Sequence, residues 1–473
     1  MIENTKKFKE LGISTTTKIN KDWYDAGLLD NIDESFLKEV DSYWSPKTER
    51  KIDKGLYTAF MNLHGIKEPK LITGSVMRYE VLPVFNDYDM TGYYGDKNIY
   101  DLIIDRSRSA VTVVRSIRGQ YFDADYNTIS PETALELLSK NENGLIIKPS
   151  KGNNGSGIAK LELKGDKVLF EDKYISVERL LKKFRGNFIV QEMLKQHPNM
   201  AAPHPASVNT IRMVTFRWNN EIKYLLAFAR FGSGDDIRDN ANVDSSPRIG
   251  VKDTGEFFDF GIGQSGEKFT EHPTTGFKFS DLKPIPNYEE FKKFVTDSHK
   301  HFIHLDFVSW DIAVGTDGKP VFIEANFAGS TAFYQLVSQK PMFGDMTEEV
   351  MKYVKETIDT KSPKLMKKHR KRIEKKELES LKKELGQNER LVKELKKELN
   401  QLKNDSTSSK ELKNKYNNMK RSMDTIRDET EKEKQQLIKE RDKYKKKYEE
   451  MAGSTSWRIT EPVRKVGSVF KKK

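Results

Sequence analysis

A strand, loop and strand pattern near residue 150 limits the folds open to this chain more than any other segment does. The apolar run 145–147 leads into Lys148 and Pro149, and a loop with three glycines follows before residues 158–163. Proline ends a hydrogen-bonded ladder, and the alternation of apolar and polar residues in 158–163 is typical of a strand. The segment therefore predicts two strands joined by a glycine-rich loop that lies as a flap over a ligand.

The composition of that loop suits a phosphate group. Glycine lets backbone N–H groups approach an anion closely, while Lys148 and Lys151 add positive charge. The alternative interpretation is a hairpin with an ordinary flexible turn. A P-loop is excluded, because Gly157 is followed by Ile158 rather than by Lys-Ser or Lys-Thr. A dinucleotide-binding glycine motif is excluded, because the following residues alternate like a strand instead of opening a helix.

The absence of cysteine excludes several classes of site. The 473 residues leave room for two or more domains, yet they can form no disulfide, thiolate nucleophile or cysteine-ligated metal site. The first residues lack the apolar segment of a signal peptide, and no run of about 18 apolar residues occurs. We therefore expect a cytoplasmic protein, in keeping with a reducing compartment.

The charge of the chain is divided unevenly. Residues 361–473 contain 36 Lys and Arg against 19 Asp and Glu, a net charge of +17, whereas the remainder contains 47 against 52, or −5. A mildly acidic body argues against nucleic acid as its ligand. We therefore expect no nucleic acid partner for the globular part.

Hydrophobic periodicity predicts a mixed α+β body at 96–360, with a mainly helical region at 1–95 packing on it. Asp96 is placed to cap a helix at 98–105. Further helices are expected at 131–140, 288–300 and 347–355. The expected strands are 110–114, 145–149, 158–163, 187–192, 210–216, 223–229, 249–252, 310–314 and 320–324.

The composition changes abruptly after residue 361. Apolar residues recur at alternating spacings of three and four from Leu378 to Leu402, which predicts a coiled coil within 361–452 that pairs with a second copy or with another protein such as a glycosyltransferase. Residues 453–473 form a basic, amphipathic tail able to lie on the anionic inner membrane surface. The alternatives are a single solvated helix and a frayed, solvated terminus.

Ligands suited to a divalent cation occur on two neighbouring apolar strands. Asp311 lies on the first strand, and Glu324 and Asn326 alternate with Ala325 along the second, so the three groups can converge on one face. A polyphosphate needs a divalent metal, and carboxylates embedded in apolar sequence need a partner. For each acid taken alone, a charge on the surface of an edge strand is the favoured interpretation.

Arg212 interrupts the apolar strand 210–216 and needs an anionic partner. A structural Asp or Glu is the favoured partner for this residue taken singly, and a bound phosphate or carboxylate is the alternative. His272, in the polar loop 272–276, is expected to be structural rather than catalytic.

Together these segments resemble the ATP-grasp superfamily, and most closely its branch described as sugar-transfer associated or alpha-L-glutamate ligase-related (RimK-like). The resemblance covers about residues 40–355 and departs from the family pattern at 245–250, where a glycine pair is expected. It rests on Lys97, the loop after Lys148, and the segments 191–194, 204–212, 272–276 and 310–326. The segment 454–460 also resembles an ending found after coiled coils in bacterial enzymes of surface-polysaccharide assembly.

The resemblance implies an α+β ATP-grasp fold, in which two subdomains clasp ATP, followed by the coiled coil. It also implies ATP and Mg²⁺ as cofactors. The residues that it implies for ATP are Lys97, Lys148, Lys151, Gly152, Asn153, Gly155, Ser156, Gly157, Gln191, Glu192, Met193 and Leu194. Those for magnesium are Asp311, Glu324 and Asn326, and those for catalysis are Arg212, Asn209 and Arg230.

We therefore predict an ATP- and Mg-dependent carboxylate–amine ligase that acts through an acyl phosphate in bacterial cell-surface polysaccharide biosynthesis, on a small molecule or glycan precursor. Two alternatives stay open. One is a kinase that phosphorylates a sugar or another hydroxyl group, and the other is a nucleotide-binding scaffold whose coiled coil recruits a glycosyltransferase.

Overall fold

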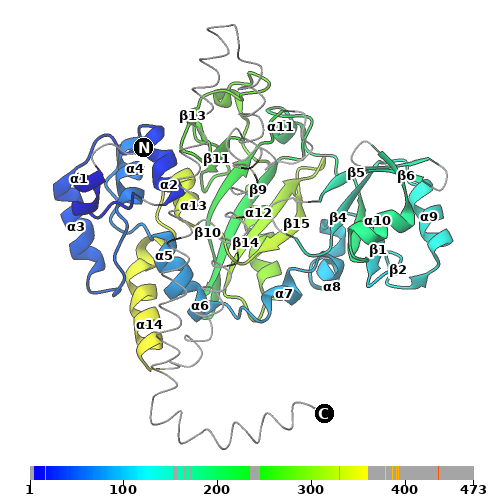
Figure 1. The fold of residues 1–473 in the computed structure, drawn as a ribbon, viewed down its shortest axis with the longest axis horizontal. Helices are drawn as coiled ribbons and strands as arrows, with labels where there is room; N and C mark the ends of the chain where they lie inside the picture. The colour runs from blue at the N-terminus through cyan, green and yellow to red at the C-terminus, as the bar shows by residue number, and fades with distance from the viewer. Residues whose placement is uncertain are drawn as a thin grey trace, which may run out of the picture. The chain divides into compact units, whose positions relative to one another are not determined.

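The computed structural model describes residues 5–15, 17–152, 157–164, 167–170, 173–234, 246–329 and 331–360, with the single positions 379, 386, 390, 393 and 435. Residues 1–366 form one compact unit (Figure 1). The predicted coiled coil and tail fall outside the described residues, apart from those single positions, so both stay predictions.

The described part of the N-terminal region is mainly helical and packs on the body. Asp33 begins α3 by accepting a hydrogen bond from the backbone N–H of Phe36, as an N-cap does. Trp23 and Trp44 are buried in one core with Phe216 of β9. The helices are α1 (Thr5–Glu10), α2 (Lys18–Asp25), α3 (Glu34–Trp44), α4 (Gly55–His64), α5 (Gly74–Val76), η1 (Met77–Val81), α6 (Leu82–Phe85) and α7 (Thr91–Tyr94).

An antiparallel sheet of eight short strands follows, in the order β3-β2-β1-β8-β4-β5-β6-β7. It is called the smaller sheet because its strands contain fewer residues in total than those of the second, seven-stranded sheet. Two helices pack against one of its faces, where Leu138 and Leu180 meet Val114, Ile147 and Val190. Its elements are η2 (Lys97–Ile99), α8 (Tyr100–Ile103), η3 (Arg106–Arg108), β1 (Thr112–Ile117), β2 (Gln120–Phe122), β3 (Thr128–Ile129), α9 (Pro131–Ser139), β4 (Leu145–Pro149), β5 (Ala159–Lys164), β6 (Lys167–Phe170), β7 (Lys173–Ser176), α10 (Val177–Lys183) and β8 (Phe188–Glu192).

The larger sheet has the strand order β13-β12-β11-β10-β9-β14-β15, and Figure 1 shows it beside the smaller sheet. Its elements are α11 (Pro198–Ala201), β9 (Thr210–Trp218), β10 (Glu221–Arg230), β11 (Arg248–Val251), β12 (Gly261–Ile262), β13 (Lys268–Phe269), η4 (Phe279–Asp281), α12 (Tyr288–His299), β14 (Phe307–Val314), β15 (Pro320–Asn326), α13 (Thr331–Ser338), η5 (Gly344–Met346) and α14 (Thr347–Thr360).

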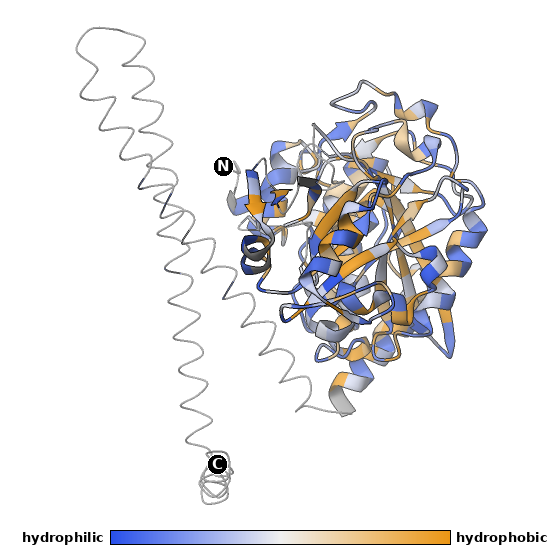
Figure 2. Ribbon diagram, turned by 90° about the vertical axis from the view of Figure 1, so that its right-hand side faces the viewer, coloured by the Kyte–Doolittle hydropathy of each residue, from blue (hydrophilic) through white to orange (hydrophobic). Residues whose placement is uncertain are grey.

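Alternation along β9 divides the apolar interior into two layers. Ile211 and Met213 join a core with α12, whereas Val214 and Phe216 join the core made with the N-terminal helices, α13 and α14. Figure 2 shows hydrophobic residues concentrated on the strands in the interior of the body. Arg212 lies on the same face as Val214 and Phe216, so a charge interrupts that layer at one end.

The structure confirms the predicted α+β class and the strand, loop and strand pattern, since Leu145 pairs with Leu161 in the antiparallel β4–β5 ladder. The helix expected at 98–105 is shorter and divided into η2 and α8. It ends at Ile103 because Ile104 has extended backbone angles and Asp105 caps the next turn. No helix among the described residues has both the length and the apolar character needed to cross a membrane.

Candidate functional site

A row of charged side chains crosses one face of the larger sheet. Glu324 on β15 lies opposite Asp311 on β14, which lies opposite Arg212 on β9. Arg230 on β10 lies opposite Thr210, which is two residues from Arg212 along β9 and so shares its face. On its other side Arg230 lies opposite Arg248 on β11. Residues directly opposite each other on neighbouring strands point to the same face. Antiparallel pairing thus gathers residues that are distant in sequence.

Asp311 is the centre of this row and is only 1% exposed. Arg212 binds it with two nitrogens, its Nε and a terminal nitrogen, the latter at 3.0 Å. Arg230 lies 3.0 Å from the same Asp311 Oδ2, and the Asn326 amide donates to that oxygen at 3.3 Å. The prediction of a structural carboxylate partner for Arg212 is therefore confirmed.

These contacts explain the charge states in the row. Burial by itself raises the pKa of the Asp311 carboxyl, but the guanidinium groups of Arg212 and Arg230 outweigh burial and hold that pKa below its ordinary value. Burial by itself lowers the pKa of Arg212, and Asp311 reverses this effect and raises it well above normal. Both groups are therefore charged in the folded protein.

Two lysines approach the row from the smaller sheet and the segment before it. Lys97 is 8% exposed, and its Nζ lies 3.1 Å from Glu324 Oε2 and 3.2 Å from the carbonyl oxygen of Gly152. Lys148, on β4, is 7% exposed. The backbone N–H of Lys97 also donates to the carbonyl of Ser150 at 2.8 Å, which ties Lys97 to the end of β4.

A cavity of about 360 Å³ lies where these groups meet. Its lining includes four cationic side chains and three carboxylates, a formal charge of +1, and Arg212 beside it brings the total to +2. A cavity with this excess suits a polyanion. The charged lining residues are Lys97, Lys148, Lys195, Arg230, Glu192, Asp311 and Glu324.

The segment predicted to hold adenine and ribose also reaches this cavity. Glu192, Met193 and Leu194 line it, whereas Gln191 is absent from its described lining. The Gln191 amide instead donates to the carbonyl of Ala110 at 3.2 Å. The carboxylate of Glu192 accepts hydrogen bonds from Asn141 and Asn143, which fix its position.

The glycine-rich loop is described only at its two ends. Gly152 accepts a hydrogen bond from Lys97, and Gly157 has φ +78°, a conformation that favours glycine. Lys151 is largely exposed and lies 3.5 Å from Asp96. Asn153, Gly155 and Ser156 fall outside the described residues.

Asn209 does not face the cavity, although it was predicted to be catalytic. Its amide nitrogen donates to the carbonyls of Met200 and His204, and its amide oxygen accepts from Ser207 and Gly232. Its hydrogen-bonding groups are thus all used within the protein. The structure gives Asn209 the place of a residue that holds the loop at 204–209.

His204 and His272 lie next to each other and hold nearby backbone segments. Their rings stack 5.2 Å apart, and each donates from Nε2 to a backbone carbonyl, of Gly234 and of Gly232 respectively. Backbone N–H groups of residues 274 and 275 point at Nδ1 of His272. Burial lowers the pKa of His272, so this ring is neutral and structural.

Sequence reasoning missed some residues of the site. Thr210 lines the cavity and accepts two hydrogen bonds from Arg230, and the Tyr334 hydroxyl on α13 contacts Arg212. Ser207, Gln196 and Ile323 also line the cavity. Small hydroxyl and apolar residues recur at no distinctive spacing in a sequence. The only sequence signal for the missed residues was closeness to Arg212 along the chain.

The donor set suits a hard divalent cation. Asp311, Glu324 and Asn326 supply two carboxylates and an amide oxygen at adjacent register positions, and such oxygens are preferred by magnesium. In this structure Asp311 Oδ2 already accepts hydrogen bonds from Arg212 and Asn326 and forms an ion pair with Arg230, and Glu324 is paired with Lys97. A cation at Asp311 Oδ2 would therefore compete with the guanidinium groups of Arg212 and Arg230.

The sequence of this chain matches the model of one known protein family. A sequence model of the family described as sugar-transfer associated ATP-grasp matches residues 77–352. No curated protein matches the chain.

Similar solved structures include the ATP-grasp ligase PsnB complexed with a minimal precursor, magnesium and ADP, which is 12% identical, with 57% of this chain and 62% of PsnB covered and a TM-score of 0.32. VanG D-Ala:D-Ser ligase from Enterococcus faecalis is 12% identical, with coverages of 58% and 64% and a TM-score of 0.34. The D-alanine-D-alanine ligase from Coxiella burnetii is 9% identical, with coverages of 66% and 71% and a TM-score of 0.32. The match thus spans less than two thirds of the length of PsnB and of VanG.

Proposed function

The chain belongs to the sugar-transfer associated ATP-grasp family, and from this premise we propose that it is an ATP- and magnesium-dependent ligase that joins a carboxylate to an amine through an acyl phosphate. The observation that supports the proposal most directly is the meeting of Lys97, Lys148 and Arg230 with Asp311 and Glu324 around one cavity. This set offers cations for a polyphosphate beside oxygen donors for its metal.

The proposed reaction has two steps, and neither needs a covalent nucleophile from the protein. In the first, a substrate carboxylate oxygen attacks the γ-phosphorus of ATP, forming an O–P bond as the bond to ADP breaks. In the second, an amine attacks the acyl carbon, phosphate leaves, and the amine loses a proton. The protein contributes positioning and stabilisation of the transferred charge.

The cationic side chains take separate parts in this proposal. Lys97 and Lys148 hold the phosphates, because both residues line the cavity and are largely buried. Arg230 and Arg212 stabilise charge on the transferred group and on the acyl phosphate. Guanidinium groups suit this part because they bind phosphate oxygens with two parallel hydrogen bonds.

The remaining assignments follow the predicted roles, except that of Asn209. The loop at 152–157, with Lys151 at its start, covers the phosphates, and the segment from Gln191 to Leu194 holds adenine and ribose. Magnesium would be held by Asp311, Glu324 and Asn326, where it supplies neutralisation of phosphate charge. Asn209 serves by holding the loop at 204–209 in place, consistent with its buried hydrogen bonds.

We further propose a role in the biosynthesis or modification of a bacterial cell-surface polysaccharide, with a small molecule or glycan precursor as substrate. The family description, sugar-transfer associated, supports this role. The predicted coiled coil would then bring the ligase to a second copy or to a glycosyltransferase. The basic tail would hold the ligase at the cytoplasmic face of the inner membrane.

The test is nucleotide turnover by the purified full chain with Mg²⁺, alone and with mixtures of amino acids and surface-sugar precursors. We expect ADP and phosphate to form only when both a carboxylate and an amine are present, and to be lost in Glu324→Gln. Asp345→Asn is the matched control for a carboxylate-to-amide change, because Asp345 is fully exposed and paired only with Lys70 in the described contacts.

Other products would point to the alternatives. ADP accompanied by a phosphorylated sugar would favour the kinase. Tight binding of ATP with no turnover in any mixture, and no effect of Glu324→Gln, would favour the nucleotide-binding scaffold. Removal of Mg²⁺ with a chelator should abolish turnover, and its return should restore it.

A further inference from the structure

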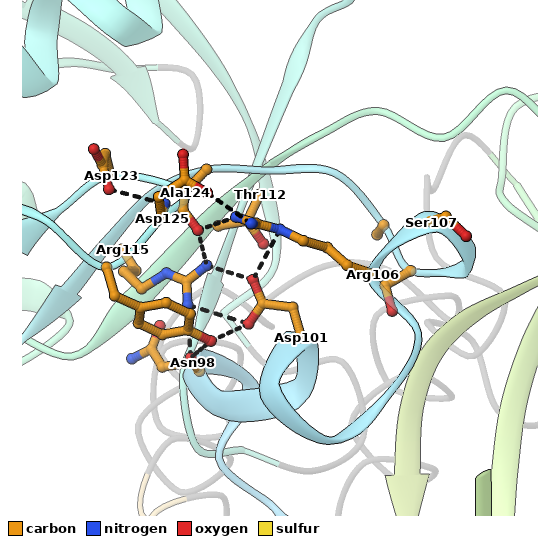
Figure 3. Close-up of polar contacts among 12 residues, drawn as sticks. Asn98, Asp101, Arg106, Ser107, Thr112, Arg115, Asp123, Ala124 and Asp125 are labelled. Atoms are coloured by element: carbon orange, nitrogen blue, oxygen red, sulfur yellow. Dashed lines mark hydrogen bonds and ion pairs between the residues drawn. The ribbon is translucent and has the colours of Figure 1, made fainter.

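The most buried charge of the smaller sheet is the guanidinium of Arg115, on β1, with a side chain that is 0% exposed (Figure 3). It donates to the two carboxylate oxygens of Asp101 at 3.2 and 2.6 Å and to the carbonyl of Asn98 at 2.9 Å. It also stacks on the ring of Tyr126, 3.8 Å from the ring centre. None of these residues is part of the described lining of the cavity.

Two of these partners belong to the segment that begins with Lys97. Asn98 lies in η2 with Lys97, and Asp101 lies in α8. These helices contain three and four residues, which is too short to be stable without outside contacts. The position of the Lys97 ammonium therefore depends on what holds this segment from each side.

On one side the larger sheet holds the segment. The ring of Tyr100 packs edge-on against Phe322 of β15, 4.9 Å between ring centres, and its hydroxyl accepts a hydrogen bond from the N–H of Ala325. On the other side the hold comes from the smaller sheet, through Arg115. The Asn98 amide adds a 3.4 Å hydrogen bond to the carbonyl of Ser116.

Strand register shows why Arg115 is suited to this task. Arg115 on β1 and Lys148 on β4 both lie opposite Ile189 of β8, so all three point to the same face of the smaller sheet. The opposite face carries Val114 and packs against α9 and α10. Arg115 thus anchors the Lys97 segment on the face that presents Lys148.

The turn that follows β2 adds Tyr126 to the contacts between Arg115 and Asp101, and these three residues are called the clamp below. The carboxylate of Asp123 accepts hydrogen bonds from the N–H groups of Asp125 and Asn127, which shapes the turn. Tyr126 is held there with φ +66°, a conformation uncommon for residues other than glycine. Its hydroxyl donates to Asp101, so the turn and the Lys97 segment share one carboxylate.

We propose that Arg115, Asp101 and Tyr126 are positioning residues that place the ammonium of Lys97 beside that of Lys148, so that the two lysines can grip the phosphates of one nucleotide together. This inference rests on the proposed function of Lys97. It adds that part of the affinity for Mg-ATP is set by a buried clamp that does not touch the nucleotide.

A double-mutant cycle tests the clamp, with binding of Mg-ATP and of adenosine to the full chain measured by calorimetry. Arg115→Lys keeps the charge but loses the planar guanidinium that binds Asp101 with two nitrogens and stacks on Tyr126. We expect it to weaken Mg-ATP binding about tenfold in the presence of Lys97 and less than twofold in Lys97→Met. Adenosine, which has no phosphate, should bind both Arg115 forms equally.

The matched control is Arg50→Lys in the N-terminal region. Arg50 also pairs with a carboxylate, Glu80, and also stacks on a tyrosine, Tyr79. We expect this variant to bind Mg-ATP as the unchanged protein does. Tyr126→Phe is the second test variant, because it removes one hydroxyl and keeps the ring; we expect a two- to threefold loss that also depends on Lys97.

The outcomes separate the clamp from the proposed function. If Lys97→Met weakens Mg-ATP binding but Arg115→Lys and Tyr126→Phe do not, the clamp is wrong and the proposed function stands. Equal losses for Mg-ATP and adenosine, or equal losses with and without Lys97, would show that Arg115 only holds the fold together. If Lys97→Met binds Mg-ATP unchanged, the proposed role of Lys97 fails, and the clamp fails with it.

Discussion

Replacement of Asp311 by Asn is the most informative single change, because it removes a charge and keeps the shape. Asp311 is 1% exposed and is the described anionic partner of both Arg212 and Arg230. Loss of one partner from a buried ion pair costs about 3–5 kcal/mol. The asparagine oxygen can still accept hydrogen bonds, and Tyr334 still contacts Arg212. We therefore expect the lower end, about 3 kcal/mol.

The same change should act on nucleotide binding in two opposite ways. Without Asp311 the formal charge around the cavity rises from +2 to +3, so binding of ATP in the presence of a chelator should become several-fold tighter. Turnover with Mg²⁺ should be lost, because a predicted metal ligand is gone. Opposite signs for affinity and turnover distinguish this mechanism from simple unfolding, which lowers both.

The assays are thermal unfolding and calorimetric titration with ATP, with and without Mg²⁺. A loss of about 3 kcal/mol corresponds to a fall in Tm of roughly 6 °C at the low end of the range for large domains. Asp345→Asn should leave the Tm and both affinities unchanged. An unchanged Tm for Asp311→Asn, or weaker binding of ATP in chelator, would refute the reasoning that Asp311 balances two guanidinium groups.

Three further predictions concern the flap, the arginine row and the core. Gly157→Ala should cost about 1–2 kcal/mol, because Gly157 has φ +78° and an added Cβ would lie 3.0 Å from Pro149; the expected readout is a lower Tm with a raised KM for ATP. Tyr334→Phe removes a hydroxyl that contacts Arg212, so kcat should fall about tenfold with little change in KM for ATP, and an unchanged kcat would contradict a role for that contact. Burial lowers the pKa of His299 from 6.5 to about 4, so the neutral ring stabilises the fold fully above pH 6.5 and this stability is lost as the pH falls toward 4. Between pH 7 and 4.5 the unfolding free energy, measured with urea, should decrease less in His299→Gln than in the unchanged protein, by up to about 3 kcal/mol. The same pH dependence in both proteins would count against the buried neutral ring.

Much of the fold was accessible from local patterns. The pair of strands around the glycine-rich loop was predicted because Lys148 and Pro149 end an apolar run and alternation resumes after Gly157. The hairpin that carries Asp311 and Glu324 was predicted in the same way, and the structure places those two residues directly opposite each other. Both cases involve segments close in sequence, where alternation alone sets which side chains share a face.

The paired arginines show where local patterns stop. Arg212 visibly needed an anionic partner, but the sequence offered many carboxylates, and only the pairing of β9 with β14 selects Asp311. The family resemblance implied a catalytic role for Asn209. The structure instead directs its amide toward backbone groups of its own loop, since a buried amide must satisfy its hydrogen bonds.

By itself, the sequence determined the α+β class, the position of the flap strands, and the kinds of side chain available for a phosphate and a metal. These follow from alternation, turn residues and charge, which are short-range properties. Tertiary structure decided which of those side chains meet: Asp311 with two arginines, Lys97 with Glu324, and Arg115 with the segment that carries Lys97. Such meetings depend on strand register and helix placement across long sequence separations, because buried charges are stable only where the whole fold provides their partners.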